Sequence, residues 1–223
     1  MNNRINAEKI KLDYEKWERK NTYELFSSYT IPTFQITTKI DLYEFPSFVK
    51  TNGLKFYPSF AHCCLKAMYS IPQFFVKVID KELYECNTLF SGFAVLDDSE
   101  SLQFIGGIPY NENIFAYNQM YDEHKIHVLT NPDDYYSQLD SNLLPTVFFT
   151  CIPWISFQSV INPIRNSCDD NLRLCWGKYY YEKNKATIDV SVQAHHGLVD
   201  GIHICRFFNH LQKIIKTFHS SEA

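Results

Sequence analysis

The segment TIDVSVQAHHGLVDGIHICRFFNHLQKIIK, residues 187–216, constrains the fold of this 223-residue chain more than any other. Apolar and polar side chains alternate along its first part up to His195, which is the pattern of a half-buried β-strand. From residue 201 to about 217, apolar side chains recur at helical spacing instead. A strand that runs within a few residues into an amphipathic helix predicts a layered fold of helices on a sheet.

The rest of the chain carries further helix and strand signals. The spacing predicts helices over 14–28, over 41–53 with Asp41 as cap and Gly53 as stop, over 58–71 and over 113–128. Strands are expected at 33–42, 74–80, 82–86, 90–96, 146–151, 173–181 and 186–194, with KNK (183–185) as a hairpin turn. This mixture predicts an α/β (α+β) two-layer sandwich. Because no repeat or linker interrupts it, we expect residues 1–223 to form a single domain.

Composition excludes several function classes. Hydrophobic residues make up 45% and aromatic residues 16% of the chain, as in an ordered globular protein. The formal charge of −4, with Lys and Arg scattered, argues against nucleic acid or an anionic membrane as a partner. The polar N-terminus and the lack of an apolar run of about 18 residues predict a soluble, cytoplasmic protein. Seven cysteines without C-x-x-C spacing favour reduced thiols over disulfides or structural zinc.

The pair His195 and His196 stands where the predicted strand ends. Neighbouring side chains of a strand point to opposite faces, so only one of the two can serve a given cavity. Gly197 and Gly201 permit sharp bends that return the Asp200 carboxylate toward His196. A histidine beside a carboxylate is a suitable general base. A hydrogen-bonded structural histidine is the alternative. The seven-residue spacing from His196 to His203 does not match a helical metal-ligand pair, so no metal is expected.

Five motifs resemble those of one family in the same order. HHGLVDG (195–201) resembles the H-H-x-x-x-D-G signature of the chloramphenicol acetyltransferase family, which is related more remotely to the catalytic domains of dihydrolipoyl acyltransferases. KWERKNTYELF (16–26), KFYPSF (55–60), PWISFQS (153–159) and GKYY (177–180) resemble the family's other motifs. The resemblance covers nearly the whole chain. It implies a mixed sheet with helices on one face, of the CoA-dependent acyltransferase type.

The resemblance also implies a mechanism. His196 would take a proton from an acceptor hydroxyl, whose oxygen would attack the thioester of acetyl-CoA without an acyl-enzyme. Thr150 stands where the family has serine and would donate a hydrogen bond to the developing oxyanion. A buried strand threonine is the alternative reading of Thr150. Asp200 would pair with Arg19 and stabilise the turn rather than relay charge, whereas an ordinary surface charge is the alternative for Arg19.

The same resemblance assigns binding residues and an assembly. Acetyl-CoA, the co-substrate, would lie along a set of lysines and aromatics, namely Lys55, Tyr57, Trp154, Lys178 and Tyr179. The acceptor pocket would include Phe26, Phe34, Leu102 and Val160. Leu102 and Val160 depart from the aromatics usual in the family, so the pocket is expected to differ. Family members are homotrimers with sites between subunits. Several of these binding residues could equally be core residues.

Three functions remain open at this point. The first is an acetyl-CoA-dependent O-acetyltransferase that inactivates chloramphenicol, a form of antibiotic resistance. The second is the same acetyl transfer to a different hydroxylated acceptor, which the departures at Leu102 and Val160 favour. The third is a catalytically silent ligand-binding or structural trimer, against which the retained His196, Asp200 and Arg19 argue. A dihydrolipoyl acyltransferase core is disfavoured because the sequence shows no lipoyl domain or linker.

Overall fold

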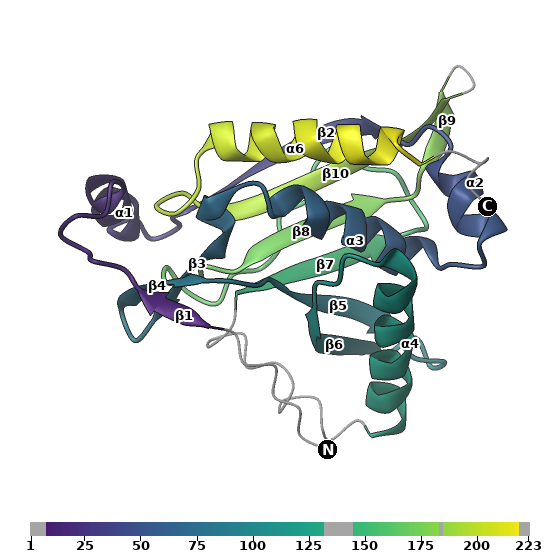
Figure 1. The fold of residues 1–223 in the computed structure, drawn as a ribbon, viewed down its shortest axis with the longest axis horizontal. Coiled ribbons are helices and arrows are strands. Elements are labelled where there is room, and N and C mark those ends of the chain that lie inside the picture. The colour runs from purple at the N-terminus through teal and green to yellow at the C-terminus, as the bar shows by residue number, and fades with distance from the viewer. Residues whose placement is uncertain (1–7, 132–144, 183–184, 219–223) are drawn as a thin grey trace.

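A mixed β-sheet forms the centre of the molecule. The computed structural model describes residues 8–131, 145–182 and 185–218 (Figure 1). In spatial order the sheet contains β2 (Thr33–Asp41), β10 (Lys185–His195), β8 (Leu172–Gly177), β7 (Thr146–Ile152), β5 (Phe90–Leu96) and β6 (Leu102–Pro109), and β9 (Tyr180–Glu182) pairs with β10. The β5–β7 and β7–β8 pairs are parallel, whereas the others are antiparallel. This arrangement places the C-terminal end of β10 beside the N-terminal ends of β8 and β7.

Three helices cover one face of this sheet: α3 (Phe56–Met68), α4 (Ile114–Thr130) and α6 (Gly201–Lys216) (Figure 1). The alternation along β10 explains the packing, because Val190, Val192 and Ala194 are buried in the core together with Phe207 and Leu211 of α6. The predicted two-layer sandwich with helices on one face of a mixed sheet is therefore confirmed.

A smaller sheet lies beside the larger one. Its order is β1 (Lys9–Lys11), β4 (Glu82–Cys86) and β3 (Val76–Ile79). The 3₁₀ turn Pro72–Phe75 precedes β3, and α2 (Phe45–Thr51) follows β2. Helix α1 (Lys20–Ser27) lies at the same end of the molecule as the loop that leads into α6 (Figure 1). This end carries the predicted base.

Several predicted boundaries were wrong. The helix expected over 14–28 begins only at Lys20, because residues 14–16 and 18–19 form turns. Asp41 caps no helix, since it is the last residue of β2, and Glu44 occupies the N-cap of α2. Helix α3 begins at Phe56, two residues before Pro58.

Strand predictions also needed correction. The segment 74–80 begins as a 3₁₀ turn, and the strand expected over 173–181 is two strands, β8 and β9. Strands β1 and β6 were not predicted. The hairpin residues 183 and 184 lie outside the described residues.

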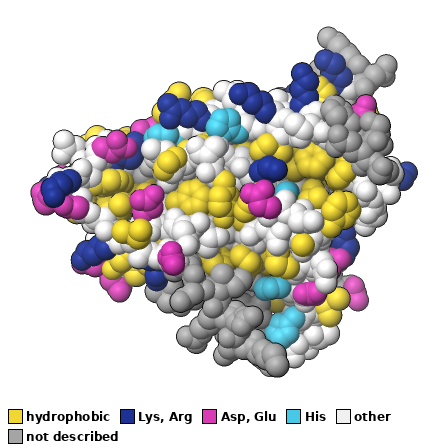
Figure 2. All heavy atoms as spheres, in the orientation of Figure 1, with side chains coloured by type: hydrophobic (Ala, Val, Ile, Leu, Met, Phe, Trp, Pro, Cys, Tyr) yellow, Lys and Arg dark blue, Asp and Glu magenta, His cyan; other side chains and the backbone are white. Residues whose placement is uncertain are grey.

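The surface over the helices shows no single-sign patch. Figure 2 shows Lys and Arg interspersed with Asp and Glu on this face, with apolar side chains between them. A helix of the length and apolar character needed to cross a bilayer is absent from residues 8–131, 145–182 and 185–218.

Candidate active site

The turn between β10 and α6 separates the two histidines as the alternation predicts. His195 ends β10 and is buried, whereas the His196 side chain remains 31% exposed. The backbone N–H of His196 donates to the Pro32 carbonyl at 2.8 Å, which fastens the turn to the residue just before β2. His196 is therefore the member of the pair that a substrate can reach.

Two aromatic rings enclose the imidazole of His196. The Phe26 ring stacks on it with a centroid distance of 4.0 Å and an interplanar angle of 6°, and the Phe34 ring lies on it at 4.3 Å and 30°. The Nδ1 atom is enclosed and lies 3.4 Å from Asp200 Oδ1, without hydrogen-bond geometry to any described residue. Nε2 is thus the ring nitrogen left for an incoming hydroxyl. Phe26 and Phe34, predicted as pocket walls, lie against the predicted base in the same chain.

Arg19 and Asp200 form the expected ion pair. Arg19 Nη1 donates to Asp200 Oδ2 at 2.5 Å, and Nη2 donates to Oδ1 at 3.0 Å. Nη2 also reaches the carbonyl oxygens of His196 and Gly197, each at 3.3 Å. The guanidinium thus binds the carboxylate with both nitrogens and holds the backbone on either side of the predicted base. The hydrogen bond from Arg19 lowers the pKa of Asp200.

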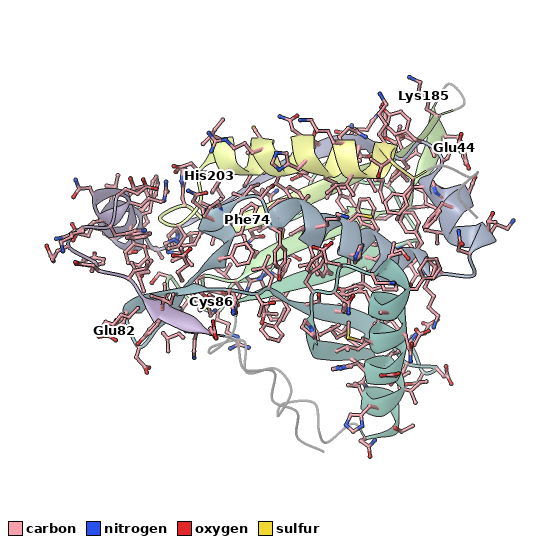
Figure 3. All side chains as sticks on the ribbon, viewed as in Figure 1. Glu44, Phe74, Glu82, Cys86, Lys185 and His203 are labelled. Carbon is pink, nitrogen blue, oxygen red and sulfur yellow. The ribbon has the colours of Figure 1, made fainter. Side chains whose placement is uncertain are left out.

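Asp200 also begins α6. It occupies the N-cap position, and its backbone N–H donates to His203 Nδ1 at 2.9 Å. Figure 3 shows His203 in the first turn of α6. The helix start and the ion pair therefore fix the same residue, which limits how far the turn can move.

The predicted CoA residues gather at the opposite end of the sheet. Lys55 is the N-cap of α3, and Tyr57 lies in its first turn. The Tyr179 ring, just past β8, lies 5.2 Å from the ring of Phe56. These contacts bring the start of α3 beside the end of β8.

The side chains predicted to bind CoA differ in the contacts that they already make. Lys55 forms an exposed ion pair with Asp122 at 2.5 Å. The Tyr57 hydroxyl lies 2.7 Å from the Phe149 carbonyl and 3.1 Å from the Ala94 carbonyl, so only its ring is available to a ligand.

Two further members of this group follow strands β7 and β8. Trp154 is 68% exposed. Lys178 is also exposed, and its backbone N–H donates to the Ile155 carbonyl at 2.7 Å.

Thr150 belongs to this second end as well. In the sheet register Thr150 lies opposite Cys175, and Cys175 lies opposite Ser191, which is five residues before His196. Five residues along a strand and two strands across correspond to about 19 Å. Since Phe149 packs into the core beneath the helices, Thr150 faces the other side of the sheet.

One chain therefore does not assemble the whole predicted site. Within a single chain His196 lies far from the PWISF segment, because this segment follows the far end of β7. Leu102 is exposed at the start of β6, the edge strand farthest from β2. Val160 lies over β10, where its carbonyl accepts from Ser191 Oγ at 3.4 Å. Two half-sites lie at opposite ends of one sheet.

The described residues contain no group of three or more His, Cys, Asp or Glu side chains placed to hold a metal ion.

Comparison with known proteins identifies the family. The family model for chloramphenicol acetyltransferase matches residues 7–212. This chain belongs to the chloramphenicol acetyltransferase family. A chloramphenicol acetyltransferase from Escherichia coli is 27% identical over 206 residues, which are 91% of each chain. A solved chloramphenicol acetyltransferase structure has a TM-score of 0.81 at 17% identity, covering 93% of this chain and 100% of that one. The cubic core of a pyruvate dehydrogenase multienzyme complex has a TM-score of 0.63 at 15% identity, covering 88% and 86% of the two chains.

Sequence reasoning missed several residues of this chloramphenicol acetyltransferase-family site. The pattern around His203 was interpreted only as a possible metal ligand, although its Nδ1 accepts from the backbone N–H of Asp200, the N-cap of α6. The loop 165–171 was not considered, although its Ser167 backbone contacts the His195 ring. A histidine three residues after an N-cap aspartate was the available signal for the first contact, because side chains at this position reach back to the cap. The second contact spans about 28 residues and has no local signal.

Replacing Arg19 by methionine is expected to lower the free energy of unfolding by about 1–3 kcal/mol near pH 7, a moderate value because the Asp200 side chain is 35% exposed. The pKa of folded Asp200 lies below its ordinary 3.8, so the pair stabilises the fold fully above that value and loses its contribution as the pH falls through the lower folded pKa. Urea unfolding of both proteins from about pH 7 down to pH 3 measures this. Equal urea midpoints for the wild type and Arg19→Met at every pH would contradict this prediction.

Proposed function

We propose that this protein transfers the acetyl group of acetyl-CoA to a hydroxyl of chloramphenicol, with His196 as the general base. The observation that supports this most is the geometry of His196: its Nδ1 is enclosed, whereas the side chain as a whole remains partly open to solvent. The family model also matches almost the whole chain. The curated relatives named as chloramphenicol acetyltransferases support this acceptor.

The reaction follows from these positions. Neutral His196 accepts the proton of the acceptor hydroxyl at Nε2, and the oxygen forms a bond to the thioester carbonyl carbon. The carbonyl oxygen gains negative charge, which the Thr150 hydroxyl stabilises by donating a hydrogen bond. When the carbon–sulfur bond breaks, the proton on His196 passes to the departing thiolate. Alcohol and thioester therefore yield ester and free thiol, and His196 returns to its neutral state.

The binding roles are proposed from the second half-site. The exposed Trp154 and the ring of Tyr179 offer flat faces to the adenine of acetyl-CoA. Lys178 is exposed and offers a cation to the phosphates, and Lys55 does the same once it leaves Asp122. On the other side, Phe26 and Phe34 form the wall of the acceptor pocket next to His196.

We infer further that the working site forms between two copies of the chain in a homotrimer. His196 and Thr150 lie about 19 Å apart, toward opposite ends of the sheet in one chain, so a single copy cannot present both to one substrate. A head-to-tail ring places the His196 end of each copy against the Thr150 end of the next. The exposed apolar side chains Leu25, Ile31, Trp154 and Ile161 lie on segments next to these two ends.

Mixing two inactive variants tests this assembly. His196→Ala and Thr150→Val should each be nearly inactive alone, but unfolding and refolding them together should recover about a quarter of wild-type activity. In every mixed cyclic trimer one of the three interfaces combines an intact His196 with an intact Thr150. Mixtures that recover nothing while native mass spectrometry shows mixed trimers would contradict a shared site.

The acceptor is tested by thiol release. Wild-type protein with acetyl-CoA should release free thiol upon addition of chloramphenicol, with the acetylated product detected by mass spectrometry. Leu102 and Val160 favour the second candidate, another hydroxylated acceptor, because smaller aliphatic side chains replace aromatic walls. Thiol release with other hydroxylated antibiotics and none with chloramphenicol would establish that candidate instead. If none of the tested alcohols causes thiol release, both candidate functions are contradicted.

A further inference from the structure

His195 is the member of the His195–His196 pair that the proposed reaction does not use. It connects two segments that are distant in the sequence. Its side chain is buried, with 3% of the residue exposed, and Nδ1 accepts a hydrogen bond from the Gly197 N–H at 3.0 Å. The backbone of Ser167 lies next to the ring, where its carbonyl can accept from Nε2. Because Nδ1 is already an acceptor, the donor is Nε2, and the ring is neutral with its proton on that atom. The imidazole therefore bridges the turn 195–200 and the loop 165–171.

The loop 165–171 is firmly anchored to strand β8. Asp169 Oδ2 accepts from Arg173 Nη2 at 2.5 Å and from the backbone N–H of Arg165 at 2.9 Å. Asp169 Oδ1 accepts from Asn171 Nδ2 at 3.0 Å. A carboxylate with this many donors holds both ends of the loop on the N-terminal end of β8.

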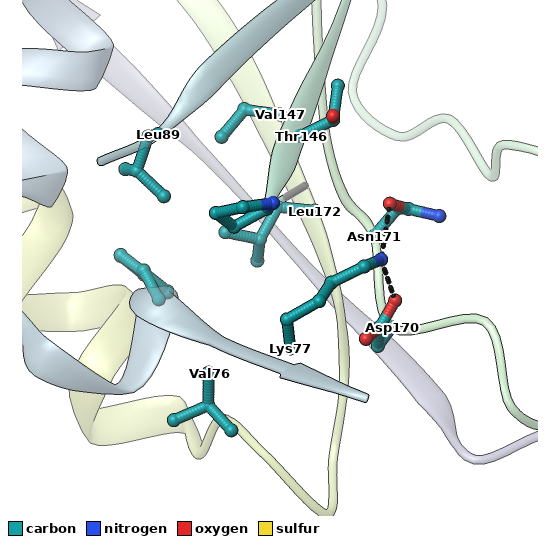
Figure 4. Close-up of a pocket in the computed structure, with 10 residues that line it drawn as sticks. Val76, Lys77, Leu89, Thr146, Val147, Asp170, Asn171 and Leu172 are labelled. Carbon is teal, nitrogen blue, oxygen red and sulfur yellow. Dashed lines mark hydrogen bonds and ion pairs between the residues drawn. The ribbon is translucent and has the colours of Figure 1, made fainter. Parts of the chain in front are cut away.

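A buried ion pair ties the same loop to the smaller sheet. Lys77 of β3 pairs with Asp170, and their side chains are only 3% and 4% exposed (Figure 4). Lys77 Nζ also donates to Asn171 Oδ1 at 3.1 Å, and the backbone N–H of Val78 donates to Asp170 Oδ2 at 2.6 Å. Contacts with both sheets therefore fix the position of the loop 165–171, which lies against His195.

The turn 195–200, on the other side of the His195 ring, is tightly packed. A Cβ added at Gly197 would lie 2.9 Å from His195 Cε1 and 3.0 Å from Tyr23 Cδ2. The Tyr23 ring itself lies against His195 at a centroid distance of 5.8 Å. The turn therefore packs directly on the imidazole, and its position depends on where that ring is held.

We propose that His195 is a positioning residue for acetyl transfer, which fastens the turn that carries His196 to the anchored loop 165–171. This assignment rests on the proposed function. His195 takes no part in the chemistry, because its Nδ1 is bonded to the Gly197 N–H, its ring lies against Tyr23 and the loop 165–171, and the residue is buried. The charged or titratable groups that face it are Asp169, Asp170, Tyr23 and His196. Burial lowers the pKa of His195, which is consistent with a neutral bridge at physiological pH.

Three substitutions at one position separate the two bonds. His195→Ala removes both, His195→Asn keeps an acceptor near the Nδ1 position for Gly197, and His195→Gln keeps a donor near the Nε2 position for Ser167. His62→Ala is the matched control, since His62 is also buried and bonds a backbone carbonyl, that of Asn111, at 2.9 Å. Each variant is compared with wild type in kcat, in KM for acetyl-CoA, in Tm and in the ¹⁵N NMR shifts of the His196 ring.

We expect His195→Ala to lower kcat about 10²-fold, with His195→Asn and His195→Gln intermediate, because a displacement of about 1 Å at the base has this effect. KM for acetyl-CoA should change less than about two-fold, since the described contacts of His195, with Gly197, Tyr23 and the loop 165–171, include none of the residues proposed to bind acetyl-CoA. His62→Ala should lower Tm but leave kcat unchanged. The His196 ring shifts should change in the His195 variants alone.

Different results would overturn the assignment. A wild-type kcat in His195→Ala, or an equal loss of kcat in His62→Ala, would show that His195 has no positioning role beyond stability. If His195→Ala does not fold, His195→Asn and His195→Gln decide the question by the same comparison. If the wild-type protein transfers no acetyl group, the proposed function is wrong. The ¹⁵N shifts of the His196 ring would still show whether His195 positions that ring.

Discussion

Replacing His196 by alanine is expected to lower kcat about 10²–10⁴-fold, the range in which a positioned general base contributes to proton transfer. The other ionisable groups described beside His196 are engaged elsewhere, because Arg19 binds the Asp200 carboxylate and the Gly197 N–H donates to His195 Nδ1. Without the imidazole, the acceptor hydroxyl has to lose its proton to water, whose basicity is too low at neutral pH. Thiol release from acetyl-CoA in the presence of chloramphenicol measures the change.

The substitution should leave the fold intact. Arg19 holds this turn through the Asp200 carboxylate and through the backbone carbonyls of His196 and Gly197, which alanine retains. Tm should therefore fall by only a few degrees, and KM for acetyl-CoA should stay close to its wild-type value. An alanine variant that turns over at the wild-type rate would remove His196 from the mechanism.

Replacing Thr150 by valine is expected to lower kcat about 10²–10³-fold, the effect of removing one oxyanion donor. Valine keeps the β-branched shape that suits strand β7, so the change removes the hydroxyl with little alteration of packing. Steady-state kinetics with both substrates should show the loss in kcat rather than in KM for acetyl-CoA, because the hydroxyl acts only on the charge that develops during the reaction.

Thr150→Ser provides the matched control. Serine keeps the O–H group and loses one methyl, so activity should stay within about ten-fold of wild type. Equal activity in the valine and serine variants would show that the hydroxyl is not the donor. Loss of activity in both, with an unchanged Tm, would show that the methyl group orients the side chain.

Local pattern was enough for the main secondary structure. The strand predicted over 186–194 and the helix predicted from 201 to about 217 correspond to β10 and α6 within one residue at each end. Hydrophobic periodicity is a local property, so long and strongly periodic elements could be predicted from it. Strand β6 was missed because its glycines at 106 and 107 interrupt the apolar pattern.

The candidate site was partly predictable for the same reason. The separation of His195 from His196 follows from strand alternation, and the ion pair of Arg19 with Asp200 follows from the family motifs that carry both residues. The capping contact of His203 and the bridge from His195 to Ser167 were not predicted. Such contacts join side chains whose partners depend on chain packing.

By itself the sequence determined the layered α/β fold, the family and the residues that carry the proposed chemistry, because periodicity and motif spacing act over a few residues or are shared by relatives. Only the tertiary structure decided where those residues lie. The strand order and the register place His196 and Thr150 at opposite ends of one sheet. This distance depends on which strands pair and in which direction, and strand pairing is set by burial across the whole sheet rather than by any local pattern.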